Sequence, residues 1–173
     1  IDAAQAFGTG HHETTTGCLE AIADVLKRRK PRYMIDVGTG TGVLAIALAK
    51  RTRLPVMATD IDPIAVEVTI ENARLNNVAN NIIAVEAAGL SHRTITENSP
   101  YDLVVANILA EPLKQLAPDI GRIAQPGATI ILSGILARQA TSVIAAYGAQ
   151  DMIFKKKIIR GDWATLTLER ATR

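Results

Sequence analysis

Three glycines at alternating positions, Gly38, Gly40 and Gly42, are the first residues of this sequence that suggest a chemical function. They follow a short apolar run and precede a segment rich in alanine and leucine, so they lie between an expected strand and an expected helix. Glycine has no Cβ, which allows a sharp turn and a close approach of the backbone to a ligand. Asp60 ends the next expected strand, where its carboxylate can accept hydrogen bonds from both hydroxyls of a ribose. Together these residues predict a binding site for a cofactor that contains adenosine.

The residues around the glycines distinguish between the adenosine cofactors. A dinucleotide fingerprint, G-x-G-x-x-G, would require glycine at position 43, which is Val43 here. Asp36 precedes the first glycine by two residues, where a carboxylate would repel a pyrophosphate but could hold a cationic amino-acid group. S-adenosylmethionine has a ribose and an α-amino group and no phosphate, so it is the cofactor that the pattern predicts. A dinucleotide and a purely structural glycine turn remain the alternatives.

Asn107 follows another apolar run and is the candidate catalytic residue. Methyl transfer from a sulfonium needs a neutral, well-positioned nucleophile, and a lysine amine has a free pKa of about 10.4. The amide oxygen of Asn107 can accept a hydrogen bond from an amine and leave the amine's lone pair free. Residues 108–110 are aliphatic, whereas recognition of a nucleobase usually depends on aromatic stacking. The sequence therefore predicts an aliphatic amine as methyl acceptor; the alternative is that Asn107 only shapes the turn or touches the cofactor.

The histidines near the start of the chain predict no metal site. His11 and His12 lie six or seven residues from Cys18, which matches no known zinc spacing. One of the histidines could accept a proton from the incoming amine, but we expect the glycine- and threonine-rich segment 7–15 to act as a mobile lid over the cofactor. Phe7 is then expected to contact the adenine or the methionine end of the cofactor.

Composition narrows the class of protein. Nineteen Lys and Arg against seventeen Asp and Glu leave a net charge of +2, so no overall charge points to nucleic acid or acidic lipid. The longest apolar run, 43–49, is too short for a membrane span, and a single cysteine suits a reducing compartment. We therefore expect one cytoplasmic domain over residues 1–173. Because the first residue is Ile1 and not methionine, we also expect the chain to be a piece of a longer protein.

Apolar runs and amphipathic segments alternate along the chain, a pattern typical of a doubly wound α/β fold with a parallel sheet. The expected strands are 33–37, 55–59, 82–85, 101–106 and 128–132. The expected helices are 14–30, 42–51, 63–75, 112–124 and 137–147, with a loop and a short helix in 87–100. Segments 151–160 and 162–170 are expected to form a closing hairpin, which places at least one antiparallel strand at the edge of the sheet.

Five motifs, taken in order, resemble those of a known family. They are AFGTGHHETT at 6–15, DVGTGTGVLAIA at 36–47, TDIDP at 59–63, ANILA at 106–110 and LSGILA at 132–137. Together they are similar to the catalytic domain of the enzymes that methylate the eleventh protein of the bacterial large ribosomal subunit. The first and fourth motifs are specific to that family, whereas many methyltransferases share the glycine turn.

The resemblance implies a Rossmann-like, class I S-adenosylmethionine-dependent methyltransferase sheet of seven strands with the last antiparallel. It implies methylation of lysine ε-amino and terminal α-amino groups of a large-subunit ribosomal protein, and no nucleic-acid contact beyond incidental proximity to the ribosome. The family also has an amino-terminal docking domain for its substrate, which this sequence does not supply. A methyltransferase of the same fold acting on RNA or a small molecule, or a non-catalytic cofactor-binding module, are the alternatives. The residues that the family would place on the cofactor are Thr15, Gly38, Asp60 and Asn107.

Overall fold

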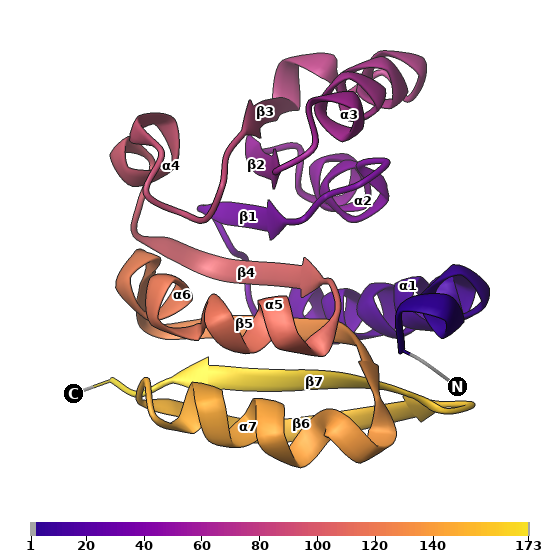
Figure 1. Ribbon diagram of the computed structural model, residues 1–173. Coiled ribbons are helices and arrows are strands. Elements are labelled where there is room, and N and C mark those ends of the chain that lie inside the picture. Colours follow the sequence, from indigo (N-terminus) through magenta and orange to yellow (C-terminus); the bar gives the residue numbers. More distant parts are fainter. Residues whose placement is uncertain (1–2, 173) are drawn as a thin grey trace.

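The computed structural model describes the backbone of residues 3–172 and the side chains of residues 11–172. Its centre is a seven-stranded sheet with the order β3-β2-β1-β4-β5-β7-β6 (Figure 1). The strands are β1 (Met34–Val37), β2 (Val56–Asp60), β3 (Ile82–Glu86), β4 (Tyr101–Asn107), β5 (Ala124–Leu136), β6 (Met152–Arg160) and β7 (Trp163–Arg170). This architecture is the class I methyltransferase sheet that the family resemblance implied.

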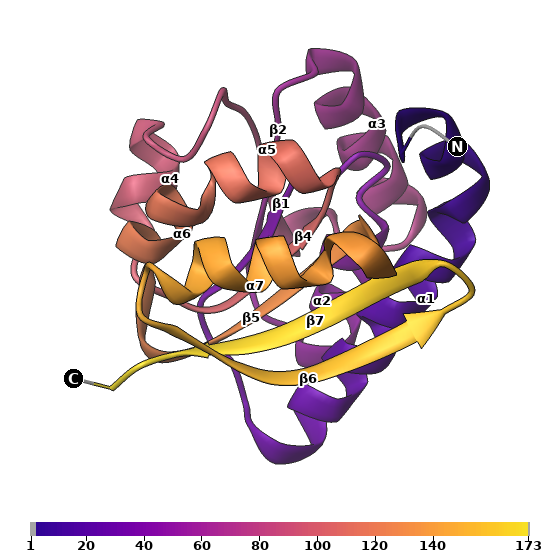
Figure 2. The same cartoon turned by 60° about the horizontal axis from the view of Figure 1, so that its bottom comes forward.

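Helices cover both faces of the sheet (Figures 1 and 2). They are α1 (Ala3–Arg28), α2 (Val43–Thr52), α3 (Pro63–Leu75), α4 (Arg93–Glu97), α5 (Ala110–Gln115), α6 (Ala117–Ile123) and α7 (Ala140–Gly148), with 3-10 turns η1 (Ala79–Asn81) and η2 (Ala137–Gln139). The first three helices contribute to one hydrophobic cluster and the last four to a second cluster across the sheet. In described residues, no helix is both long and apolar enough to cross a membrane.

Strands β1 to β5 are parallel. The order in which the chain adds strands to the sheet reverses between β1 and β4. The chain moves outward from β1 through β2 to β3 and then returns to add β4 on the other side of β1. The carboxyl ends of β1 and β4 therefore diverge into helices on opposite faces, which leaves a crevice for a ligand. The four residues of β1 are all buried, as expected of a central strand between two helical layers.

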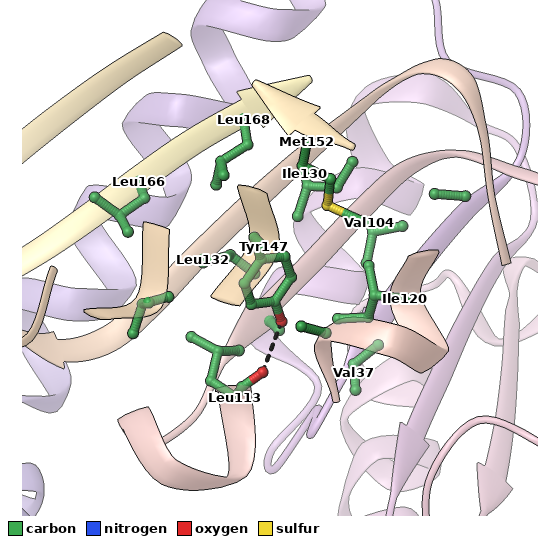
Figure 3. Close-up of a cluster of buried hydrophobic side chains, with 14 of the residues drawn as sticks. Val37, Val104, Leu113, Ile120, Ile130, Leu132, Tyr147, Met152, Leu166 and Leu168 are labelled. Atoms are coloured by element: carbon green, nitrogen blue, oxygen red, sulfur yellow. Dashed lines mark hydrogen bonds between the residues drawn. The ribbon is translucent and has the colours of Figure 1, made fainter. Parts of the chain in front are cut away.

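The second cluster ties the carboxyl-terminal half of the chain together. Tyr147 of α7 is fully buried, and its hydroxyl donates a hydrogen bond of 2.9 Å to the carbonyl oxygen of Leu113 in α5 (Figure 3). Burial raises the pKa of the Tyr147 hydroxyl far above its usual range, so the hydroxyl stays a hydrogen-bond donor. The helix that follows β4 is thus anchored to a helix that follows β5.

Two helix predictions were wrong. Segment 7–15, the expected lid, lies within α1, because this helix runs from Ala3 to Arg28 and does not begin at residue 14 as expected. Its two glycines cost only about 1 kcal/mol each in a helix, less than the packing of the rest of α1 on the sheet contributes. The expected helix 112–124 is divided into α5 and α6, because Pro118 cannot donate a backbone hydrogen bond to the preceding turn.

The closing hairpin and an antiparallel last strand, which the sequence and the family resemblance predicted, are confirmed. The antiparallel strand is β7, which lies between β5 and β6, so the lysine-rich β6 forms the edge of the sheet. The residues of β7 are mostly buried and those of β6 mostly exposed, so the strand with fewer charged residues takes the interior place. Strand β5 begins at Ala124, four residues before the expected strand 128–132, and its pairing with β4 is irregular near this start.

Candidate functional site

A cavity of about 980 Å³ opens at the carboxyl edge of the sheet, at the crevice beside β1 and β4. Its described lining consists of the turn after β1, the residues after β2 and β3, and the segment from Asn107 into α5. His11 of α1 adds to the lining from the helix whose start lies at the same edge (Figure 1). The cavity therefore brings together the motifs that are scattered along the sequence.

The turn after β1 depends on glycine for two different reasons. Gly38 and Gly40 have φ angles of 68° and 57°, in the left-handed region that favours glycine. A Cβ on Gly38 would overlap the Cγ2 atom of Ile108, whereas a Cβ on Gly40 would meet no protein atom within 4 Å. The amides of Gly38 and Thr39 both donate to the carbonyl of Thr59, which holds the turn against β2. Gly38 thus allows close packing and Gly40 leaves open space beside the backbone.

Asp60 is held rigidly at the end of β2. Its Oδ2 accepts a hydrogen bond of 2.9 Å from the amide of Gly40, and its Oδ1 accepts one of 3.0 Å from the amide of Asp62. Each carboxylate oxygen can accept more than one hydrogen bond, so both retain capacity for a ligand. Asp60 is half-buried and lines the cavity, and this geometry suits two adjacent hydroxyls of a ribose.

Asp36 is almost fully buried beneath the same turn. Its Oδ2 accepts hydrogen bonds from the Thr39 hydroxyl at 2.8 Å and the Ala45 amide at 3.1 Å. Burial raises the pKa of Asp36 to about 6, against the opposing effect of these two hydrogen bonds, and the charge of Asp60 raises it further. Asp36 therefore joins the turn to α2, and its buried charge would be stabilised by a cationic group in the cavity that it helps to line.

Asn107 is the last residue of β4 and contacts α1. Its Nδ2 donates to the Oγ1 of Thr14 at 3.4 Å, and Thr14 is fully buried. Its Oδ1 is buried and has no hydrogen-bond partner among the residues with described side chains. The next amide, that of Ile108, donates to the carbonyl of Ser133 at 3.1 Å. The segment after β4 is therefore fastened by residues from both ends of the chain.

Gly134 supports that segment and was missed as a site residue in the sequence. Its φ angle is 81°, and a Cβ there would lie 2.5 Å from the carbonyl oxygen of Ile108 and 2.8 Å from its C and N atoms. The pairing of β5 with β7 shifts register beside it, between Leu132 and Ile135. The glycine in LSGIL was visible in the sequence, but nothing local indicated which backbone it would meet.

An aliphatic rim around the cavity was also missed. Ile61 and Ile64 are 70% and 67% exposed and line the cavity together with Ala65 and Val68. The available signal was two isoleucines on either side of Asp62 and Pro63, at a helix start where polar residues are more common. Such a rim offers apolar contact to a flat group such as a purine.

Two predicted cofactor residues are absent from the described lining of the cavity. Thr15 shares a hydrogen bond of 3.2 Å with the Nδ1 of His11, and it is not among the described lining residues. The side chain of Phe7 lies outside the described residues. The structure does bring Asp36, Gly38, Gly40, Asp60 and Asn107 together in the lining. No group of three or more His, Cys, Asp or Glu side chains in the described part of the chain could hold a metal ion.

Comparison with known families gives a match over nearly the whole sequence. The profile of the family described as ribosomal protein L11 methyltransferase (PrmA) matches residues 1–171. The ribosomal protein L11 methyltransferase of Rhizobium johnstonii is 51% identical over 170 residues, which cover 98% of this chain and 58% of that protein. That of Brucella suis is 50% identical over 169 residues, covering 98% of this chain and 59% of that protein. The chain thus spans somewhat more than half the length of these relatives.

Solved structures have the same fold. The ribosomal protein L11 methylase of Lactobacillus delbrueckii subsp. bulgaricus superposes with a TM-score of 0.85 at 31% identity, covering 94% of this chain and 81% of that one. An RNA methyltransferase of Salinibacter ruber, solved in complex with S-adenosyl-L-homocysteine, superposes with a TM-score of 0.69 at 15% identity, covering 90% of this chain and 91% of that one. At that identity the second likeness shows the fold alone.

Proposed function

Since the chain belongs to the ribosomal protein L11 methyltransferase family, we propose that it transfers methyl groups from S-adenosylmethionine to lysine ε-amino and terminal α-amino groups of a large-subunit ribosomal protein of the L11 type. Residues 1–173 form the catalytic domain in this proposal, and the reaction takes place in the cytoplasm. The observation that carries it is the convergence of the glycine turn, Asp60 and Asn107 on one cavity.

The residues of the cavity fit the parts of the proposed cofactor. Asp60 binds the ribose hydroxyls, and the backbone of Gly38 and Gly40 allows the ligand to approach the turn. Asp36 stabilises the cationic amino-acid end, because its own charge is buried without a described cationic partner. When bound, S-adenosylmethionine supplies an activated methyl group on a sulfonium. Thr15, Phe7 and Asn107 complete the proposed set of cofactor contacts.

Asn107 is the proposed catalytic residue, because it would contact the amine that accepts the methyl group. Its Oδ1 is a buried acceptor that lacks a described partner, so an N–H of the incoming amine would satisfy it. Ile108 and Leu109, which follow it in the chain, and Leu116 add aliphatic side chains to the lining of the same cavity, which disfavours the charged ammonium form and lowers the pKa of a lysine there. The side chains of the site thus favour a neutral, oriented amine.

Titration calorimetry with S-adenosylhomocysteine tests the cofactor proposal. We expect saturable binding by this chain, no binding of NAD, and strong loss of binding in Asp60→Ala. Asp162→Ala, in the β6–β7 turn away from the cavity lining, serves as the control. Binding of NAD in preference to S-adenosylhomocysteine would contradict the assignment.

Transfer of a labelled methyl group tests the acceptor. Purified L11-type ribosomal protein and ribosomal RNA are offered separately, and we expect label only on the protein, at amino nitrogens. Label on the RNA would favour the alternative acceptor instead. Asn107→Ala is expected to lose transfer while the protein acceptor and the labelled cofactor are both present at saturating concentration.

A further inference from the structure

A threonine of the expected lid, not itself predicted to contact the cofactor, makes the described side-chain contact to Asn107. Thr14 lies on α1, is fully buried, and accepts a hydrogen bond from the Asn107 Nδ2 at 3.4 Å across 93 positions of sequence. It was not among the residues that the family resemblance placed on the cofactor. Its neighbour Thr15 points to His11 instead.

The hydroxyl of Thr14 has one proton to donate, and that proton is already used. Thr14 Oγ1 donates to the carbonyl of His11 at 3.2 Å, one turn earlier in α1. Only the lone pairs of Oγ1 are therefore available to Asn107. A carboxamide presents either its NH₂ group or its oxygen to a neighbour, and here only the NH₂ group can form a hydrogen bond.

Because Thr14 can only accept a hydrogen bond from Asn107, the position of the Asn107 amide oxygen is determined. If the carboxamide were turned over, Oδ1 and the Thr14 oxygen would face each other as two acceptors, and the amide NH₂ would lose its described acceptor. In the observed orientation the NH₂ group has an acceptor and Oδ1 is left buried without a described partner. A buried polar atom without a partner costs about 1–3 kcal/mol, so a ligand that donates a hydrogen bond to Oδ1 is favoured.

We propose that Thr14 is a positioning residue that orients the Asn107 carboxamide so that its oxygen, and not its nitrogen, is available to the incoming amine. The inference rests on the proposed function, since it gives Asn107 an amine to orient. An amide nitrogen in that place would repel the N–H groups of the amine. Thr14 acts through Asn107 and has no contact with the substrate in this proposal.

The orientation can be tested without any substrate. Nuclear magnetic resonance of protein labelled with ¹⁵N-asparagine reports the side-chain NH₂ signals, and Asn107→Asp identifies those of residue 107. We expect Thr14→Ser, which keeps the hydroxyl, to preserve the Asn107 signals. Thr14→Val keeps the shape and removes the acceptor, so it should shift these signals and speed the exchange of their protons with water. Unchanged Asn107 signals in Thr14→Val would overturn the inference.

Methyl transfer to the L11-type protein gives the second readout. We expect kcat to fall by about 100-fold in Thr14→Val, the effect of a misplaced contact to a reacting group, and to be restored in Thr14→Ser. The affinity for S-adenosylhomocysteine should stay at the wild-type value in both variants. Thr16→Val, on the same helix and outside the described lining, controls for loss of a threonine hydroxyl from α1.

The two readouts separate the failure of this inference from the failure of the proposed function. Full transfer by Thr14→Val would overturn the positioning role while leaving the methyltransferase assignment intact. No transfer by the wild type, with the expected change in the Asn107 signals, would overturn the acceptor proposal and support the orientation by Thr14. Thermal melting of each variant shows whether the fold is retained.

Discussion

Two of the chain segments that line the cavity, the turn after β1 and the segment after β4, are held in place by different means. The first contains its own glycines at 38, 40 and 42, all with positive φ, and is held by the adjacent strand β2. The second, residues 107–109, contains no glycine and is held by Thr14 of α1 and by Ser133 and Gly134 of β5. A binding turn can therefore be encoded locally, whereas the segment that carries the candidate catalytic residue depends on distant parts of the chain.

Ile108 connects the two segments. Its side chain occupies the space that a Cβ on Gly38 would need, and its backbone occupies the space that a Cβ on Gly134 would need. A displacement of Ile108 would therefore change the turn and the catalytic segment together. Substitutions of the two glycines that face Ile108 test this dependence.

Gly134→Ala should have the largest effect. The added Cβ overlaps the backbone of Ile108, which cannot rotate away, and the positive φ adds strain. We expect a loss of about 2–4 kcal/mol in the free energy of unfolding and a reduction of about 100-fold in methyl transfer. Urea unfolding and labelled methyl transfer measure the two effects.

Gly148→Ala is the matched control for that variant. A Cβ on Gly148, at the end of α7, meets nothing within 4 Å and its φ is not positive. The substitution should leave transfer unchanged and keep the free energy of unfolding within about 1 kcal/mol of the wild type. Equal losses in the two variants would contradict a specific role for the contact between β5 and Ile108.

Gly38→Ala should have a smaller effect that is partly reversible. Its Cβ meets the Ile108 side chain, which can be shortened, so the double variant Gly38→Ala with Ile108→Ala should regain part of the affinity for S-adenosylhomocysteine. The strain of a positive φ remains, and we expect it to cost about 1 kcal/mol in unfolding free energy. A double-variant cycle by calorimetry measures the coupling, and simple additivity would show that the two segments are independent.

The buried carboxylate of the turn predicts a pH dependence. Asp36 has a raised pKa of about 6 in the folded chain, against an ordinary value of 3.8, so its ionised form is the less stable one there. A cationic ligand favours the ionised form, so the affinity for S-adenosylmethionine should rise as the pH increases through about 6 and then level off. The unliganded protein should lose the stability contributed by protonated Asp36 over the same rise, because the folded state binds that proton more tightly.

Calorimetry between pH 5 and pH 8 covers about one unit below and two units above the pKa of Asp36 and measures the affinity for S-adenosylmethionine. Asp36→Asn should flatten the dependence of this affinity on pH. Asparagine retains an oxygen for the Thr39 hydroxyl and the Ala45 amide, so the turn keeps its anchor. A profile unchanged by this variant would place the titrating group elsewhere.

Ser133→Ala should have the smallest effect on activity. Its hydroxyl bonds with the Ala164 carbonyl and the Thr165 hydroxyl inside the sheet, whereas the carbonyl that holds Ile108 belongs to its backbone and is retained. We expect a loss of about 1–2 kcal/mol in unfolding free energy with near-normal methyl transfer. A large loss of transfer at full stability would assign the side chain a direct role.

Part of the site could be predicted from the sequence because its geometry is local. A strand, three glycines and a helix are adjacent in the chain, and Asp60 follows at the end of the next strand, so their meeting needs only the parallel order of β1 and β2. The roles of Thr14 and Gly134 could not be predicted in this way. Thr14 precedes Asn107 by 93 positions, and which neighbour it meets depends on where α1 crosses the sheet.

The fold shows the same division. Helix α3 and the short helix in 87–100 were predicted correctly, because Pro63 and the polar segment give local signals. The closing hairpin was also predicted correctly, but the order of its two strands in the sheet was not predicted, because a hairpin alone does not specify which strand pairs with β5. The rest of the sheet decides that, by burying one strand on both sides.

The sequence by itself determined the alternation of strands and helices, the glycine turn and the acid opposite it, because periodicity, positive φ and chain spacing are properties of neighbouring residues. Only the tertiary structure decided which carbonyl, hydroxyl and glycine hold Asn107 and Ile108. Those contacts join residues from three distant parts of the chain, and their distances exist only after the sheet and α1 have packed together.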